Sequence, residues 1–183
     1  MEDKSIIELY WKRDERAIEE SRVKYGAYCS TIARNILNSN EDAEECLNST
    51  WLSAWNSMPP KIPQRLSAFL GRLTRNHALD CYRKNTSSKR SNSQVTLCLE
   101  ELSQCIGENY PIDDKIVLRQ LLDRFLHELP SSSQRIFLLR YWYIMPIEKI
   151  AVSCGISEGA VKMQLQRMRA RLRAILEKEG IGS

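Results

Sequence analysis

The chain has 183 residues, 43% of them hydrophobic and 27% charged, and its net charge is +4. This length suits one or two small domains, and the hydrophobic fraction is too high for a wholly disordered protein. No run of 18 apolar residues occurs and the polar start lacks the apolar centre of a signal peptide, so we expect a cytoplasmic protein with no membrane segment of its own.

Three successive segments in the first half show helical periodicity. Residues 22–38 and 65–84 place apolar side chains on one side at steps of three and four, and between them Leu47, Trp51 and Trp55 recur at steps of four. This spacing favours a role in the core for both tryptophans over a role as aromatic stacking surfaces. Three helices with this pattern can bury a common core.

A cap and a proline-rich break bound the second of these helices. Ser39 followed by Asp42 resembles a capping box, and the four carboxylates within residues 41–45 suit the positive end of a helix dipole. Residues 58–63 end the helix, because proline cannot donate the backbone hydrogen bond that a helix interior requires. Dipole capping does not require four acidic residues, so the cluster also predicts contact with basic groups of a partner.

Residues 86–112 lose the helical pattern, beginning serine-rich and basic and then turning acidic. We interpret this segment as a linker with a short helical piece near residues 97–104. Regular helical spacing resumes after it. The sequence therefore predicts an all-α fold of two small helical domains, residues 1–85 and 113–183.

The C-terminal domain contains the pattern of a helix-turn-helix. A short helix that opens at Pro146 ends at Gly155, which suits a left-handed C-cap, and Ser157 caps a longer second helix. One narrow sector of that second helix is apolar: Val161, Leu165, Met168 and Leu172. We expect this stripe to face the core.

The opposite face of the second helix carries side chains that can bind DNA. Four of them lie where a recognition helix meets base edges: Lys162, Met163, Gln166 and Arg167. Lysine and arginine can donate to guanine, glutamine can pair with adenine, and methionine can contact a thymine methyl group. Three further residues are better placed for phosphates: Arg169, Arg171 and Arg173. A solvated amphipathic surface helix is the alternative interpretation.

Charge is concentrated in three patches. Residues 66–90 carry six cations against one carboxylate, residues 157–173 carry five against one, and residues 41–45 have a net charge of −4. Two separate basic patches indicate a polyanion bound at two places, and the acidic patch indicates a different partner.

The cysteines and histidines do not suggest a metal site or a catalytic centre. Six cysteines occur without a C-x-x-C pair, and the only histidines, His77 and His127, belong to different domains. The sequence also lacks a glycine-rich phosphate loop and a pairing of nucleophile and base. We therefore expect no cofactor, no metal and no enzymatic activity, with thiols that stay reduced.

The order of these motifs resembles that of bacterial RNA polymerase sigma factors of the extracytoplasmic-function (ECF) group. The resemblance rests on "EDAEECLNSTWLSAW", a proline-rich break, "FLGRLTRNHALDCYRK", an acidic linker and the helix-turn-helix, and it runs from about Ser5 to about Glu177. It implies region 2 in residues 1–85 and region 4 in residues 113–183. It also implies a factor that binds core RNA polymerase, recognises −35 and −10 promoter elements, and assists promoter melting.

The resemblance assigns roles to three groups of residues. Binding of the polymerase β′ clamp helices is implied for Asp42, Glu45 and Asn48. Binding and melting of the −10 element is implied for Arg72, Arg75, Asn76 and Arg83. Contact with the bases of the −35 element is implied for Lys162, Met163, Gln166 and Arg167. The −35 site that we expect also includes the cap residue Ser157 and the phosphate-binding candidates Arg169, Arg171 and Arg173.

Further partners follow from the same resemblance. Contact with the β flap is implied, and members of the group are commonly held inactive by an anti-sigma factor. The acidic linker residues Glu100, Glu101 and Glu108 are implied to lie near the RNA exit path, where carboxylates can mimic a nucleic-acid backbone.

Two other functions compete with this interpretation. A stand-alone helix-turn-helix regulator would bind an operator without polymerase, but it leaves the acidic helix and the basic face of residues 72–83 unexplained. An adaptor whose basic faces meet acidic proteins would lack the steep salt dependence that phosphate contacts produce.

Overall fold

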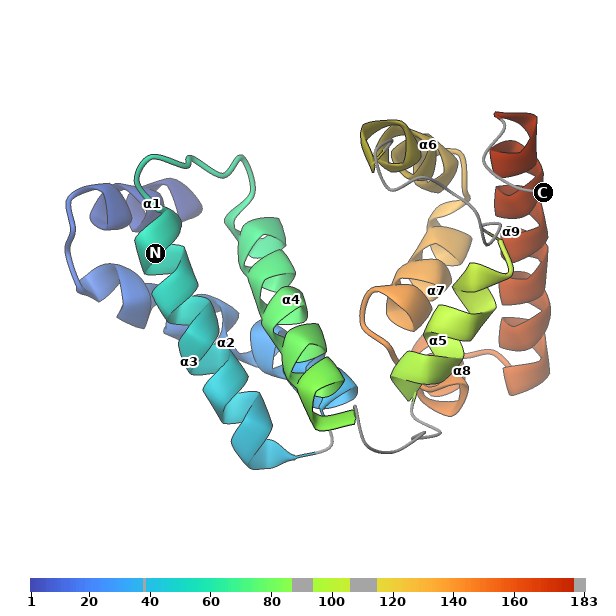
Figure 1. Ribbon diagram of the computed structural model, residues 1–183, viewed down its shortest axis with the longest axis horizontal. Coiled ribbons are helices and arrows are strands. Elements are labelled where there is room, and N and C mark those ends of the chain that lie inside the picture. The colour runs from blue at the N-terminus through green and yellow to red at the C-terminus, as the bar shows by residue number, and fades with distance from the viewer. Residues whose placement is uncertain (38, 87–93, 106–114, 180–183) are drawn as a thin grey trace. The chain divides into compact units, whose positions relative to one another are not determined.

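The described residues of Met1–Ser91, the first of two units in the computed structural model, form four helices, which can be followed in Figure 1. They are α1 (Asp3–Trp11), α2 (Arg16–Ile36), α3 (Asn40–Ser57) and α4 (Leu66–Thr86). Helices α2, α3 and α4 pack on one another, and α1 packs against α2. The sequence predicted the last three, although α2 begins earlier than residue 22 and α1 was not singled out.

The core of this unit is built from the apolar faces that the periodicity predicted. Leu70 is fully buried and Trp51 is 4% exposed, which confirms the tryptophan as a core residue. Trp55 is half-buried, with its ring centroid 6.2 Å from that of Tyr10 and 5.3 Å from the guanidinium carbon of Arg13. Both tryptophans are therefore occupied by packing within the unit.

Where the structure describes the second unit, Asn92–Ser183, it contains five helices. They are α5 (Gln94–Ser103), α6 (Lys115–His127), α7 (Ser131–Tyr141), α8 (Ile147–Cys154) and α9 (Glu158–Lys178). Helices α6, α7 and α8 all pack against α9, so the longest helix organises this unit. Helix α5 is the helical piece that was expected near residues 97–104.

Helices α8 and α9 form the predicted helix-turn-helix. Gly155 joins them in the left-handed conformation with φ 66°, and the Ser157 hydroxyl accepts a 3.2 Å hydrogen bond from the Ala160 amide. Pro146 occupies the N-cap position of α8, which begins one residue later. The predicted apolar stripe of α9 is buried: Val161 at 0%, Leu165 at 1%, Met168 at 5% and Leu172 at 1% exposure.

The structure describes residues 1–37, 39–86, 94–105 and 115–179. Within these ranges all regular secondary structure is helical, which confirms the all-α prediction. None of the helices described there combines the length and the apolar character that crossing a membrane requires. Glu108 lies outside the described residues.

Candidate functional site

The outer face of α9 carries the side chains predicted to contact bases. Lys162, Met163, Gln166 and Arg167 are all exposed, on the side opposite the buried stripe. Met163 is 52% exposed although it is apolar. No residue in the described ranges forms an ion pair with Lys162 or Arg167, so both cations are available to a ligand. Ser157, also exposed, caps the end of α9 from which this face begins.

Two of the arginines predicted to bind phosphates are in exposed ion pairs. Arg171 Nη2 lies 2.7 Å from Glu128 Oε2, and Arg173 Nε lies 2.7 Å from Glu177 Oε1 one turn along α9. Exposed pairs of this kind contribute little net stability, so a phosphate can exchange for the carboxylate at small cost. Both arginines therefore remain compatible with phosphate binding.

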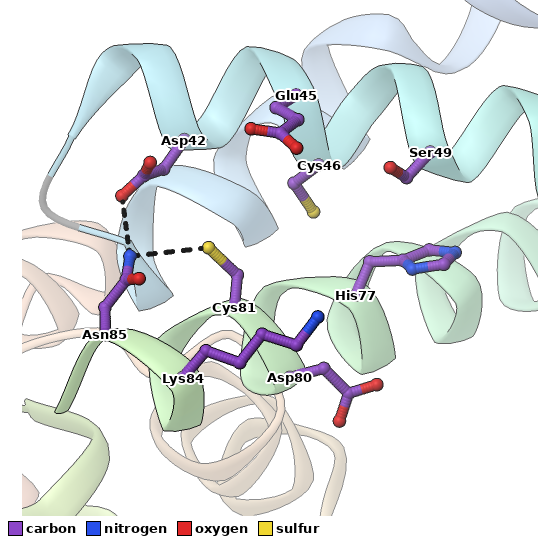
Figure 2. A pocket seen from close by; sticks show the side chains of 9 residues that line it. All are labelled: Asp42, Glu45, Cys46, Ser49, His77, Asp80, Cys81, Lys84 and Asn85. Atoms are coloured by element: carbon purple, nitrogen blue, oxygen red, sulfur yellow. Dashed lines mark hydrogen bonds between the residues drawn. The ribbon is translucent and has the colours of Figure 1, made fainter. Parts of the chain in front are cut away.

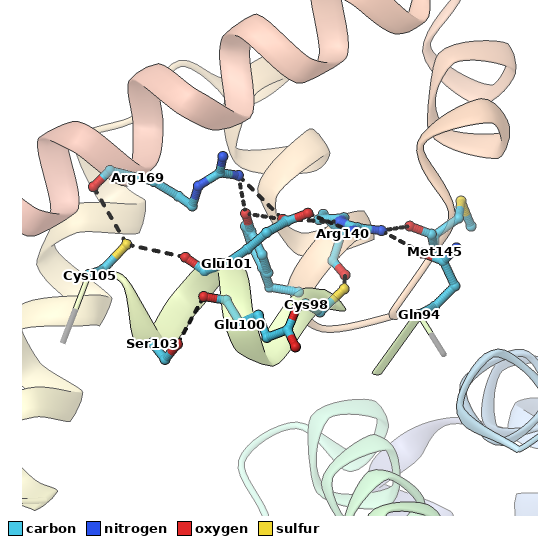
Figure 3. Close-up of polar contacts among 10 residues, drawn as sticks. Gln94, Cys98, Glu100, Glu101, Ser103, Cys105, Arg140, Met145 and Arg169 are labelled. Atoms are coloured by element: carbon cyan, nitrogen blue, oxygen red, sulfur yellow. Dashed lines mark hydrogen bonds and ion pairs between the residues drawn. The ribbon is translucent and has the colours of Figure 1, made fainter. Parts of the chain in front are cut away.

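Arg169 differs, because its guanidinium points toward the side chain of Glu101 within the same unit (Figure 3). Its Nη1 donates to Tyr141 Oη at 2.8 Å and to Glu101 Oε2 at 3.3 Å, and the side chain is only 22% exposed. The Tyr141 hydroxyl also donates to Glu101 Oε2 at 2.8 Å. This arginine therefore has partners within the protein that the sequence did not suggest.

Glu101 also forms an ion pair with a buried arginine of α7. Arg140 Nη2 lies 2.7 Å from Glu101 Oε1, and the Arg140 side chain is 2% exposed. Arg140 Nη1 donates to Gln94 Oε1 at 2.8 Å and to the Met145 carbonyl at 3.2 Å. Burial alone raises the pKa of the Glu101 carboxyl, but the hydrogen bonds and charges of its partners outweigh burial and lower it. Glu101 is thus held as a carboxylate.

The basic face of α4 is the candidate surface for the −10 element. Arg72, Asn76 and Arg83 are exposed on this helix. The Arg72 guanidinium lies 5.9 Å from the Phe69 ring centroid, and Arg83 Nη1 lies 3.2 Å from Asp80 Oδ1 in an exposed pair. Arg75 is half-buried and already interacts with other groups of the protein.

The acidic end of α3 is capped as predicted. The Ser39 hydroxyl accepts a 3.1 Å hydrogen bond from the Asp42 amide and donates at 2.9 Å to Glu41 Oε2. The backbone amide of Glu41 and the Ser39 hydroxyl together lower the pKa of the Glu41 carboxyl. Glu45 and Asn48, one and two turns further along, are exposed.

A pocket of about 330 Å³ lies between α3 and α4 beside this acidic end (Figure 2). Asp42 Oδ2 accepts a 3.1 Å hydrogen bond from Asn85 Nδ2 across it. Burial raises the pKa of the Cys46 thiol in its wall to about 12, which keeps that thiol neutral and a weak nucleophile. In the described part of the chain, no three His, Cys, Asp or Glu side chains are grouped to hold a metal ion.

Arg140, Tyr141 and Asn85 were not predicted as functional residues. Arg140 had a local signal, because it is a lone cation inside the apolar run "IFLLRYWYI". Its partner Glu101 lies 39 residues away in sequence, on another helix. No local pattern identifies such a pairing.

Comparisons with known proteins match both units. Residues 24–88 match the family model of Sigma-70 region 2, and residues 119–172 match that of Sigma-70, region 4. The chain is 24% identical over 169 residues to the RNA polymerase sigma factor CnrH of Cupriavidus metallidurans, covering 90% of this chain and 88% of the relative. It also aligns with a solved structure of CnrH in complex with the cytosolic domain of CnrY, over 96% of this chain and 97% of that chain, at 22% identity and a TM-score of 0.45.

Proposed function

The chain belongs to the sigma-70 family as an RNA polymerase sigma factor of the ECF type, and from this premise we propose which of its surfaces meets each partner. A factor of this family binds core RNA polymerase and promoter DNA and directs promoter-specific initiation. We assign region 2 to residues 1–85, region 4 to residues 113–183, and the connection to residues 86–112.

The −35 element is read by the outer face of α9. The observation that carries this assignment is the pair of exposed cations, Lys162 and Arg167, on a capped helix whose opposite side is buried. An α-helix fits the major groove, where lysine and arginine donate to guanine and Gln166 can pair with adenine. Arg171 and Arg173 lie further along the helix and bind phosphates by exchanging their exposed carboxylate partners.

The −10 element is bound by the exposed face of α4. Arg72, Asn76 and Arg83 present two cations and an amide along one helix. Opening a duplex costs a few kcal/mol per extruded base, and a protein recovers this by holding the unpaired strand on cations and polar groups. This face therefore assists melting by stabilising the separated strand.

Core polymerase is contacted through the N-terminal part of α3. Glu45 and Asn48 are exposed there, and the half-buried Asp42 lies one turn before Glu45. Carboxylates on such a surface complement basic side chains of the β′ clamp helices.

Four further assignments rest on the family resemblance. The protein acts in the cytoplasm, contributes no catalytic step of its own, and is restrained by an anti-sigma factor that contacts the free chain. Region 4 meets the β flap of the polymerase.

Run-off transcription with purified core polymerase tests the proposal. The full chain should make core enzyme that lacks other sigma subunits initiate at discrete sites, which are mapped by sequencing transcript 5′ ends. A stand-alone regulator would leave such an enzyme without specific initiation. Mapped start sites should share sequence elements near −35 and −10.

A further inference from the structure

We propose that Glu101 is a positioning residue for −35 recognition. It lies on α5, in the connection between the two regions, and it fixes α9 against α7. Arg169, in consequence, stabilises region 4 and does not bind a DNA phosphate. The inference rests on the proposed function, because it assigns α9 the reading of the −35 element.

The position of α5 in the fold is the first argument. Glu101 precedes the stretch that matches the region 4 family, which begins at residue 119. Helix α5 nevertheless belongs to the compact unit Asn92–Ser183. A segment expected to be a linker with a short helical piece therefore contributes a helix to the DNA-reading unit.

The two oxygens of Glu101 join three helices (Figure 3). From α5, Oε1 pairs with Arg140 Nη2 of α7 at 2.7 Å, and Oε2 pairs with Arg169 Nη1 of α9 at 3.3 Å. Tyr141 of α7 closes the network, since its hydroxyl donates to Glu101 and accepts a 2.8 Å hydrogen bond from Arg169. The carboxylate thus sets the distance between α9 and α7.

Two buried thiols, one on α5 and one two residues after its end, contact the same two helices. Cys98 Sγ donates to the Arg140 carbonyl at 3.3 Å, and Cys105 Sγ donates to the Arg169 carbonyl at 3.7 Å. Cys98 is 1% exposed and Cys105 is 3% exposed. The thiols therefore contact the backbone at the same two positions whose side chains Glu101 holds.

The burial of Arg140 decides whether this network positions α9 or only masks Arg169 from DNA. If Glu101 served only to mask Arg169, DNA binding would require Glu101, and α5 with it, to leave this network. That displacement would deprive Arg140, 2% exposed, of its ion-pair partner, and an uncompensated buried charge is strongly destabilising. The contact is therefore one that persists when DNA binds.

The first test is transcription by reconstituted holoenzyme on a mapped promoter whose −35 element is intact or scrambled. We compare Glu101→Gln with Glu100→Gln, a matched change at the exposed neighbouring glutamate. The readout is the ratio of activity on the intact promoter to activity on the scrambled one, which cancels any effect on polymerase or RNA common to both promoters. We expect this ratio to fall several-fold in Glu101→Gln and to stay at the wild-type value in Glu100→Gln. A larger ratio in Glu101→Gln would show that Glu101 restrains DNA binding, and an unchanged one would show that it does not position α9; either result overturns the proposal.

The second test separates positioning from phosphate binding by the salt dependence of promoter affinity. Each phosphate contact contributes about 0.9 to the slope of log affinity against log salt concentration. Arg169→Gln should leave the magnitude of the slope at the wild-type value, whereas Arg171→Gln should reduce that magnitude by about 0.9. A shallower salt dependence for Arg169→Gln would mean that this arginine binds phosphate after all.

The third measurement needs neither polymerase nor promoter. Amide hydrogen exchange of the free full chain, read by mass spectrometry, should be faster in peptides from α5 and from the part of α9 around Arg169 in Glu101→Gln than in Glu100→Gln. Equal protection in both variants would refute the coupling of α5 to α9. Should wild-type protein fail to direct transcription while this exchange difference is present, the proposed function would fail and the structural coupling would stand.

Discussion

The ionisation state of the Glu101 carboxyl affects the stability of the second unit. Its pKa is lowered from the ordinary value of 4.5 because Arg140, Tyr141 and Arg169 favour the charged form more strongly than burial opposes it. A carboxyl with a lowered folded-state pKa contributes stability that is present above the unfolded pKa and is lost as the pH falls through the folded value.

The pH dependence of stability follows from this sign. We expect Glu101→Gln to lower the free energy of unfolding by up to about 3 kcal/mol at pH 7, because it leaves Arg140 without its counter-charge. The difference from wild type should shrink as the pH falls below the ordinary carboxyl pKa of 4.5 and through the lower folded-state pKa, because the wild-type carboxyl then also becomes neutral. Urea unfolding at several pH values, followed by circular dichroism, measures it; a difference that stays constant down to pH 3 would contradict the assignment.

Gly155 is the residue at which the turn of the helix-turn-helix depends on backbone freedom. Its φ of 66° disfavours any side chain, although an added Cβ would meet no atom within 4 Å. Gly155→Ala should therefore destabilise the protein by about 1 kcal/mol through backbone strain alone. Gly159→Ala is the control, because it lies in α9, where its Cβ would make an ordinary 3.9 Å contact and alanine favours the helix. Thermal unfolding should show opposite shifts for the two variants.

At the scale of the element, local rules made α9 predictable. The Ser157 cap, the left-handed Gly155 and the buried stripe from Val161 to Leu172 each depend on a few neighbouring residues, and the structure has all three. The partner of Arg169 was not predictable in this way, since Glu101 lies 68 residues earlier and pairing depends on how the helices pack. Sequence spacing therefore indicated which face of α9 is outward, but not which cations on its border are already engaged.

The outer face of α9 gives a prediction about promoter selectivity. Arg167→Ala should lose about tenfold in affinity or transcription on promoters with an intact −35 element, since one good base contact is worth about 1–3 kcal/mol. Arg173→Ala is a suitable comparison, because it removes the same charge from an exposed site further along the helix. This variant should lower activity on the intact and the scrambled promoter by the same factor. Equal loss on both promoters for Arg167→Ala would exclude a base-reading role.

The acidic end of α3 gives a prediction about the polymerase. Asp42→Ala combined with Glu45→Ala should reduce co-purification with core enzyme by about tenfold or more, since truncating close charge pairs at an interface costs 2 kcal/mol or more. Glu2→Ala combined with Glu8→Ala removes the same charge from exposed positions at α1. This control should bind core enzyme as wild type does. A similar loss in both double variants would indicate a general effect of charge and not a docking site.

At the scale of the whole molecule, one chain carries the two proposed DNA-binding faces in separate units. The basic faces of α4 and α9 belong to units with separate cores, Met1–Ser91 and Asn92–Ser183. When one face is bound, the second binds as an intramolecular event at an effective concentration that depends on whether both sites can be reached together. Promoter recognition should then depend on the spacing between the two elements as well as on their sequences.

The length of DNA between the two promoter elements tests this coupling when wild type is compared with Arg167→Ala, the variant weakened at the −35 element. Lengthening the DNA between the −35 and −10 elements by five base pairs turns the −35 element about half a helical turn away, so wild-type holoenzyme should lose most of the gain from −35 recognition. Arg167→Ala has already lost much of that gain and should respond far less to the same insertion. Run-off transcription on the two spacers with both proteins gives the comparison as a double-mutant cycle between protein and promoter. Equal losses in both proteins would mean that α9 does not read the element whose position was changed, and that the two faces do not act together on one promoter.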